Sequence, residues 1–249
     1  MEPANNMIQQ HPTAEAPWTS FTAGLKAGIP IAIGYIPIAI AFGLLAKASG
    51  APDYLGLLMS LLIFAGASQF VGINLLSLGT AFSEIVLTTF ILNLRHFLMC
   101  AAISQRIEKT TSKRWMALLA FGITDETFTV AALQEQEKLS KHFILGLNVM
   151  AFAAWNAGTW GGVFLAAGLP ESLKISMGIA LYVMFIGLLI PSMKKSRSVL
   201  VVALLAMGLH ALLQWLPLLS GLSTGWKIII ATMFSATTGA ILFKEEDEQ

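Results

Sequence analysis

Long apolar segments, separated by short polar stretches, make up most of the chain. A helix needs about 20 apolar residues, within a range of about 17–25, to cross the hydrocarbon core of a bilayer. Most of the apolar segments fall within this range. The eight segments are 24–46, 55–76, 81–103, 115–133, 143–167, 175–190, 199–216 and 226–243. The pattern predicts a polytopic transmembrane helix bundle with about seven or eight apolar segments.

Helices rather than strands are expected in every segment. A lipid-spanning segment has to satisfy its own backbone hydrogen bonds, and a helix does so internally. Spanning strands would give alternating runs of about ten residues, which the sequence lacks. The expected fold class is therefore all-α. One transport domain at 21–243 is expected between a disordered polar tail at 1–20 and an acidic tail at 244–249.

Two basic loops predict the topology and require an irregular segment between them. The loops at 106–114 and 194–197 are rich in lysine and arginine, so the positive-inside rule places both in the cytoplasm. Three apolar segments separate the loops, and three full crossings would put the loops on opposite sides. At least one segment is therefore expected to be broken or re-entrant. The candidates are 115–133, which carries an acidic pair, and 143–167, which carries a glycine-rich string.

A weak internal repeat agrees with this interpretation. The stretch 43–66 resembles 162–187 in its spacing of glycines, a proline and an acid. Chance similarity between apolar sequences is the alternative explanation. A true repeat would pair 24–76 with 143–190 as inverted copies, because an odd number of crossings separates them. Inverted repeats with broken helices are an architecture of secondary transporters.

Charge content supports a membrane location and narrows the function classes. Only 12% of the 249 residues are charged, whereas about a quarter are charged in a typical soluble domain. The net charge is only +1 and the basic residues form no broad face, so nucleic acid is not an expected partner. The start of the chain lacks the features of a signal peptide. Cys100, the one cysteine, is expected to be a small buried apolar residue.

The first apolar segment is rich in helix-breaking residues. Pro37 removes one backbone donor and frees the carbonyl of Ile33, and Gly34 lies between them. One interpretation is a kinked but continuous helix, because glycine and proline are common in membrane helices. The other is an unwound stretch from Gly34 to Pro37, whose free backbone groups bind the ends of a zwitterionic substrate.

Charged side chains inside the apolar segments are candidates for function. A charge at the bilayer centre costs about 2.5–3.5 kcal/mol on insertion scales. Each charged residue in an apolar segment is therefore expected to have a structural or functional role. Arg95 is either a snorkelling arginine or a buried cation paired with Asp125 or Glu126. The two acids are either wet at the interface or buried, and a buried carboxylate takes up a proton more readily. A buried pair would be a coupling site that responds to substrate or to a proton.

Uncharged polar residues add candidates for the binding of substrate. Gln69 lies among small residues, and its amide either binds substrate or forms an interhelical hydrogen bond. Trp155 and Asn156 are expected to line the same cavity. A lone histidine such as His210 is more often structural than part of a proton relay. The glycines within 158–162 predict close approach between helices.

Several other classes of protein are disfavoured by missing motifs. The sequence has no Walker A loop, no HExxH or GxSxG motif and no cluster of cysteine and histidine. We therefore expect no enzymatic activity, no cofactor and no metal. A channel for small solutes remains an alternative, which uphill exchange would exclude. A membrane-embedded enzyme acting through Asp125 and Glu126 is a weaker alternative, which predicts turnover without transport.

Five strings in the sequence together resemble the AzlC family. They are Gly34–Pro37 with Ala41–Gly43, Phe64–Phe70, Leu92–His96, Thr124–Phe128 and Trp155–Gly162. The resemblance covers the chain from about Phe21 to Phe243, and the strings FAGASQF and NLRH are together specific. Members of that family are large subunits of branched-chain amino acid exporters, which work with a small membrane subunit of the AzlD type.

The resemblance implies a secondary exporter in the lipid bilayer of the cell inner membrane, driven by protons. The implied substrates are valine, leucine and isoleucine, with methionine as a further candidate. Combined with the polar positions above, it gives a candidate substrate site of Gly34, Tyr35, Pro37, Gln69, Asn93, Trp155 and Asn156. The candidate coupling residues are Arg95, His96, Asp125 and Glu126.

Overall fold

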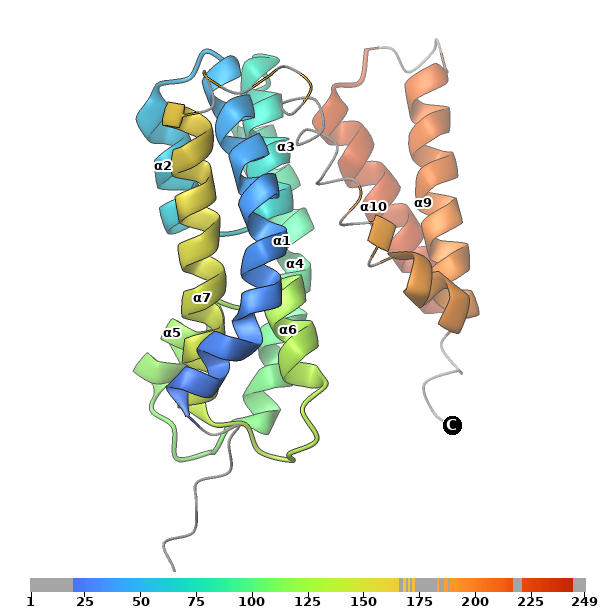
Figure 1. Ribbon diagram of the computed structural model, residues 1–249. Coiled ribbons are helices and arrows are strands. Elements are labelled where there is room, and N and C mark those ends of the chain that lie inside the picture. The colour runs from blue at the N-terminus through green and yellow to red at the C-terminus, as the bar shows by residue number, and fades with distance from the viewer. Residues whose placement is uncertain are drawn as a thin grey trace, which may run out of the picture. The chain divides into compact units, whose positions relative to one another are not determined.

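The computed structural model is built from helices in the part of the chain that it describes (Figure 1), which confirms the predicted all-α class. The described residues are 20–165, 168, 170, 172, 183, 186–187, 189–216 and 221–243. The predicted tails, most of the segment at 175–190 and much of the second repeat copy lie outside them. The helices are α1 (Phe21–Ala48), α2 (Asp53–Leu62), α3 (Gly66–Ser77), α4 (Phe82–Arg106), α5 (Lys113–Phe121), α6 (Asp125–Ala132), α7 (Lys141–Trp160), the π-helical turn η1 (Gly161–Leu165), α9 (Arg197–Trp215) and α10 (Thr224–Leu242).

Within the described residues, four helices are long and apolar enough to cross a membrane, namely α1, α4, α9 and α10. The surface of α4 shows the consequence for solvation. Phe82, Val86, Phe90 and Phe97 recur at intervals of four or seven residues, and all four are exposed, Phe82 by 78%. An apolar stripe of this length requires an apolar solvent. The described chain is therefore a helical membrane bundle.

The described chain forms two compact units. The first contains the residues up to Ile31 together with 99–151, and the second contains 32–98 together with the residues from Phe152 onward. The helices α5 and α6 belong to the first unit, and α2, α3, α9 and α10 belong to the second. The long helices α1, α4 and α7 contribute residues to both.

Helix α1 is continuous through Gly34 and Pro37, so the unwound alternative for this segment is wrong. In the second unit α1 packs closely on α7, as the predicted role of the glycines requires. A side chain at Gly158 would meet Ala39, and one at Gly162 would meet the backbone of α1. Membrane helices associate through small residues, and this close contact with α7 stabilises α1 as a continuous helix in spite of its proline.

The apolar segment 55–76 is broken into α2 and α3, so its prediction as one continuous span was wrong. Phe64, in the break, has a φ of 47°, a left-handed conformation that bulky residues rarely adopt. Its buried ring packs edge-on against Phe152 of α7, with 5.1 Å between the centroids. Gly66 then starts α3 directly beneath the Trp155 ring, where a side chain at that position would lie 2.8 Å from it. Tertiary packing therefore explains the break.

The segment 115–133 is broken into α5 and α6, which confirms the predicted broken segment. Thr124 caps α6 and exchanges hydrogen bonds with Thr127 in a capping box. Gly122 lies against the amide of Asn148, so a side chain does not fit there. The other candidate, 143–167, is not broken at its tryptophan, because α7 continues to Trp160 and leads into η1.

Arg106, at the end of α4, is a structural residue rather than a free loop cation. Its guanidinium donates four hydrogen bonds of 2.5–3.0 Å to the carbonyls of Ala131, Ala132, Gln134 and Gln136. These carbonyls end α6 and begin the loop after it, where a helix leaves acceptors without internal partners. Arg106 therefore caps the C-terminal end of α6, the second of the two short helices in the broken segment 115–133.

Candidate functional site

A closed set of buried hydrogen bonds lies beside the α2–α3 break. The indole N–H of Trp155 donates to Gln69 Oε1 at 3.1 Å, and the Gln69 amide nitrogen donates to Ser60 Oγ at 2.9 Å. The hydroxyls of Ser60 and Thr159 are 2.7 Å apart. Thr159 donates to the carbonyl of Trp155 at 2.9 Å, so Ser60 donates to Thr159. The direction of every proton in the set is thereby fixed.

Burial makes this set a strong constraint on the geometry. Ser60, Gln69 and Thr159 are fully buried, and Trp155 is 2% exposed. An unsatisfied buried polar group costs about 1–3 kcal/mol, so the four side chains favour one arrangement. The Gln69 amide nitrogen carries two N–H donors, and its described hydrogen bond uses one of them. No described hydrogen bond uses the second donor.

Aromatic rings hold the indole of Trp155 from two sides. Tyr35 meets it edge-on, with 5.2 Å between centroids and 75° between planes. Phe42 lies nearly parallel to it at 6.5 Å and 23°. Ring pairs at these separations are favourable arrangements. Together with Gly66 on another side, they give an apolar wall next to the amide of Gln69.

Two further amides lie in the same unit. Ser68 donates to Asn93 Oδ1 at 2.7 Å, and the Asn156 amide donates to the carbonyl of Phe152 at 2.9 Å. Hydrogen bonds and ring contacts therefore tie five of the predicted substrate residues to α1, α2, α3, α4 and α7. They are Tyr35, Gln69, Asn93, Trp155 and Asn156.

The other two predicted substrate residues have a different setting. Gly34 and Pro37 lie on the intact helix α1, and a side chain at Gly34 would meet no atom within 4 Å. The helix does not unwind here, so a role of Gly34 and Pro37 in binding the substrate stays a prediction.

The α3 half-helix begins without a cap. Ala65 precedes it and makes no side-chain capping hydrogen bond. The first N–H groups of any helix lack internal acceptors and carry partial positive charge. In the second unit, the start of α3 therefore offers donors to a carboxylate next to Gln69. The α6 half-helix differs, since Thr124 caps it.

The predicted coupling residues fall in both units. Arg95 and His96 lie half-buried on α4, in the second unit. Asp125 and Glu126 are the first two residues of α6, half-buried in the first unit. The start of a helix is a favourable place for negative charge. The pairing of Arg95 with either acid stays a prediction.

Several polar contacts involve residues that the sequence pattern did not predict as functional. Ser60 and Thr159 were not singled out, although both are small polar residues inside apolar segments. Glu84 was also missed, because it lies near the end of its segment, where a wet carboxylate is ordinary. Its Oε1 accepts from the Ser223 hydroxyl and from the backbone N–H of Trp226, at the start of α10.

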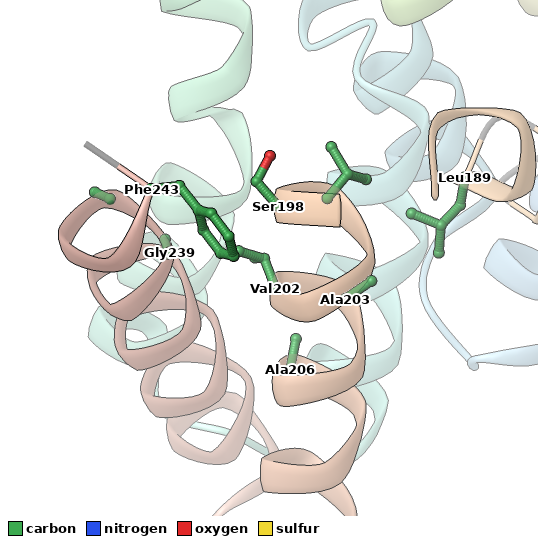
Figure 2. A pocket seen from close by; sticks show the side chains of 10 residues that line it. Leu189, Ser198, Val202, Ala203, Ala206, Gly239 and Phe243 are labelled. Atoms are coloured by element: carbon green, nitrogen blue, oxygen red, sulfur yellow. The ribbon is translucent and has the colours of Figure 1, made fainter. Parts of the chain in front are cut away.

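A cavity of about 590 Å³ lies between α9 and α10, near the end of α10 (Figure 2). Its lining is apolar apart from the Ser198 hydroxyl, and includes Val202, Ala206, Gly239 and Phe243. The charged ends of an amino acid would find no counter-charge here. In the described part of the chain, no three His, Cys, Asp or Glu residues group as metal ligands would.

Known proteins resemble the chain over most of this architecture. A family model described as AzlC protein matches residues 30–169, a range that contains all five strings noted above. The inner membrane protein YgaZ of Escherichia coli strain K12 is 33% identical over 192 residues, 75% of this chain and 78% of that one. An uncharacterized membrane protein of Archaeoglobus fulgidus is 36% identical over 176 residues, 70% of this chain and 76% of that one.

A named transport protein matches a shorter stretch. The branched-chain amino acid transport protein AzlC of Bacillus subtilis is 31% identical over 115 residues, 45% of this chain and 44% of that one. No solved structure matches significantly.

Proposed function

The chain belongs to the AzlC family of membrane transport proteins, and on that premise we propose that it exports branched-chain amino acids. The substrates are valine, leucine and isoleucine, with methionine as a further candidate. The transport is secondary and driven by protons across the cell inner membrane. The chain acts as the large subunit beside a small AzlD-like subunit. The name of the Bacillus subtilis transport protein supports the substrate class, and the name of YgaZ, an inner membrane protein, supports the membrane.

The buried network at the α2–α3 break is the observation that carries the proposal. A branched-chain amino acid has two charged ends and an apolar tail. The uncapped start of α3 and the second N–H of Gln69 suit the carboxylate. The rings of Tyr35, Phe42 and Trp155 supply apolar surface for the tail. The substrate therefore binds at this break.

The start of α6 is the proposed site of proton coupling. Asp125 and Glu126 stand at the start of α6, where a change of protonation alters the charge at a helix end. Arg95 and His96, from α4, complete the coupling set. Protonation of one acid changes its attraction to a cation, and this change drives the alternation between conformations.

Charge supports one cytoplasmic side for both basic loops. Glu84, in the first turn of α4, bonds Ser223, which follows α9 and precedes α10. The start of α4 and the end of α9 thus lie at one face. The loops at 106–114 and 194–197 are both rich in lysine and arginine, so by the positive-inside rule we assign both to the cytoplasm.

Accumulation in cells tests the proposal. Cells that express the chain with its small subunit are fed an isoleucine-containing dipeptide, and intracellular isoleucine is measured. Export keeps the internal level low. Gln69→Leu removes the amide from the network, so internal isoleucine should rise to the level of cells without the protein. Gln105→Leu, at an exposed side chain, is the matched control and should export normally. Normal export by Gln69→Leu would remove this site from the mechanism.

A further inference from the structure

Lys227 is a buried cation that the proposed mechanism does not use. It lies in the first turn of α10 and is 7% exposed. Its ammonium donates to Gln214 Oε1 on α9 at 3.1 Å. In the described part of the chain no carboxylate forms an ion pair with it, and Glu84 bonds Ser223 and the Trp226 N–H instead. A buried charge without a counter-ion is costly, so this ammonium calls for an anion.

Lys227 also orients Gln214 toward a cavity. Because the ammonium occupies the amide oxygen, the two N–H donors of Gln214 remain for another partner. Gln214, an exposed side chain, lines an open cavity of about 500 Å³ between α9 and α10. His210, one turn earlier on the same face of α9, lines it too, and so does Thr232 from α10. The cavity therefore has polar groups on both helices.

The rest of the lining is apolar. Ala206, Met207, Ile228 and Ala231 form walls without charge. The volume falls in the range of about 300–1,000 Å³ that is usual for small-molecule sites. Ala206 also lines the apolar cavity of Figure 2, so the two cavities adjoin along α9. Polar donors backed by a positive charge, next to apolar walls, suit a monocarboxylate with a branched apolar tail.

We propose that this cavity is a second binding station for the transported amino acid, and this rests on the proposed function. The amide of Gln214 binds the carboxylate, with the ammonium of Lys227 behind it. His210 and Thr232 supply further hydrogen bonds, and the apolar walls hold the tail. This station shares no residue with the site at the α2–α3 break. The transported molecule therefore has two stations within the second unit.

Equilibrium binding of radiolabelled L-isoleucine to the full chain in lipid nanodiscs tests the second station. The native chain should bind two molecules. Lys227→Met should retain one, with at least a tenfold weaker affinity at the lost station. Gln214→Leu, at an exposed side chain, should give the same result if Lys227→Met fails to fold. Lys109→Met, in the loop after α4, is the matched control and should bind two. L-isoleucinamide, which lacks the carboxylate, should not compete at this station.

Each other outcome overturns the second station. One bound molecule in the native chain removes it and leaves the proposed function standing. Two bound molecules in Lys227→Met remove it as well. Loss of all binding in a folded Lys227→Met chain shows a single shared site. No binding of isoleucine to the native chain contradicts the proposed function itself, and the second station with it.

Discussion

Four residues lie around the indole of Trp155. Its N–H meets Gln69, the rings of Tyr35 and Phe42 lie against it, and Gly66 leaves room for its outer edge. Displacing the indole would leave Gln69 Oε1 buried without a donor, at a cost of about 1–3 kcal/mol. The site should therefore be sensitive to shape as well as to polarity.

Gly66→Ala tests this sensitivity to shape. The added methyl group would lie 2.8 Å from the Trp155 ring, so the indole has to move away from Gln69. We expect the initial rate of isoleucine efflux from loaded vesicles to fall about tenfold, which corresponds to about 1.4 kcal/mol. Gly208→Ala, in α9, is the control, because no atom lies within 4 Å of its methyl group. Equal rates in the two variants would contradict the role given to Trp155.

Sequence alone could find part of this site. Gln69 and Trp155 are conspicuous as polar groups in apolar segments, and the resemblance pointed to the same strings. Ser60 and Thr159 were not predictable, because small hydroxyl residues in helices commonly bond their own backbone. Their contact joins positions 99 residues apart, which no local pattern encodes. The three-dimensional packing of α2 on α7 is what brings them together.

At the scale of helices, the two breaks have different physical causes. The α5–α6 break was predictable from its acids, and Thr124 caps the new helix with local chemistry. The α2–α3 break contains no charged residue and no proline. Its cause is the packing of Phe64 and Gly66 on α7. The proline of α1 failed to unwind its helix, because α1 packs closely on α7 along its glycines. Packing on a neighbouring helix therefore decides where a helix is interrupted more than local helix-breaking residues do.

Arg106→Met tests the clamp on α6. The change removes four hydrogen bonds to carbonyls at the end of this half-helix. Bonds from charged groups contribute about 1.5–3 kcal/mol each, and partial replacement by water leaves an expected loss of about 2–4 kcal/mol. The thermal midpoint in detergent should fall by several degrees. Arg114→Met, at an exposed side chain in α5, should leave the midpoint unchanged. A stable Arg106→Met chain would mean that the loop holds α6 without the arginine.

At the scale of the whole molecule, composition and periodicity predicted the class correctly. Apolar segments of membrane length became helices, and exposed apolar stripes such as that of α4 mark the surface that lipid covers. The number of full spans was not predictable from segment lengths. Broken segments such as 55–76 and 115–133 have the length of a span but consist of two short helices.

Labelling of the two basic loops tests the topology. In a Cys100→Ala background, Lys109→Cys and Lys195→Cys are treated in intact cells with a thiol reagent that does not cross the membrane. Both positions should be protected, and both should react once the membrane is opened. The reason is that both loops are rich in lysine and arginine, which the positive-inside rule places in the cytoplasm. Reaction of one position alone in intact cells would contradict the assigned topology.

Counterflow tests the central claim, that the α2–α3 break carries a branched-chain amino acid across the membrane by alternating access. Vesicles that contain the full chain and its small subunit are loaded with unlabelled isoleucine and diluted into labelled isoleucine. The native protein should raise internal label transiently above its equilibrium level, and Gln69→Leu should abolish this overshoot. Label that only equilibrates, or an undiminished overshoot in Gln69→Leu, would contradict the account.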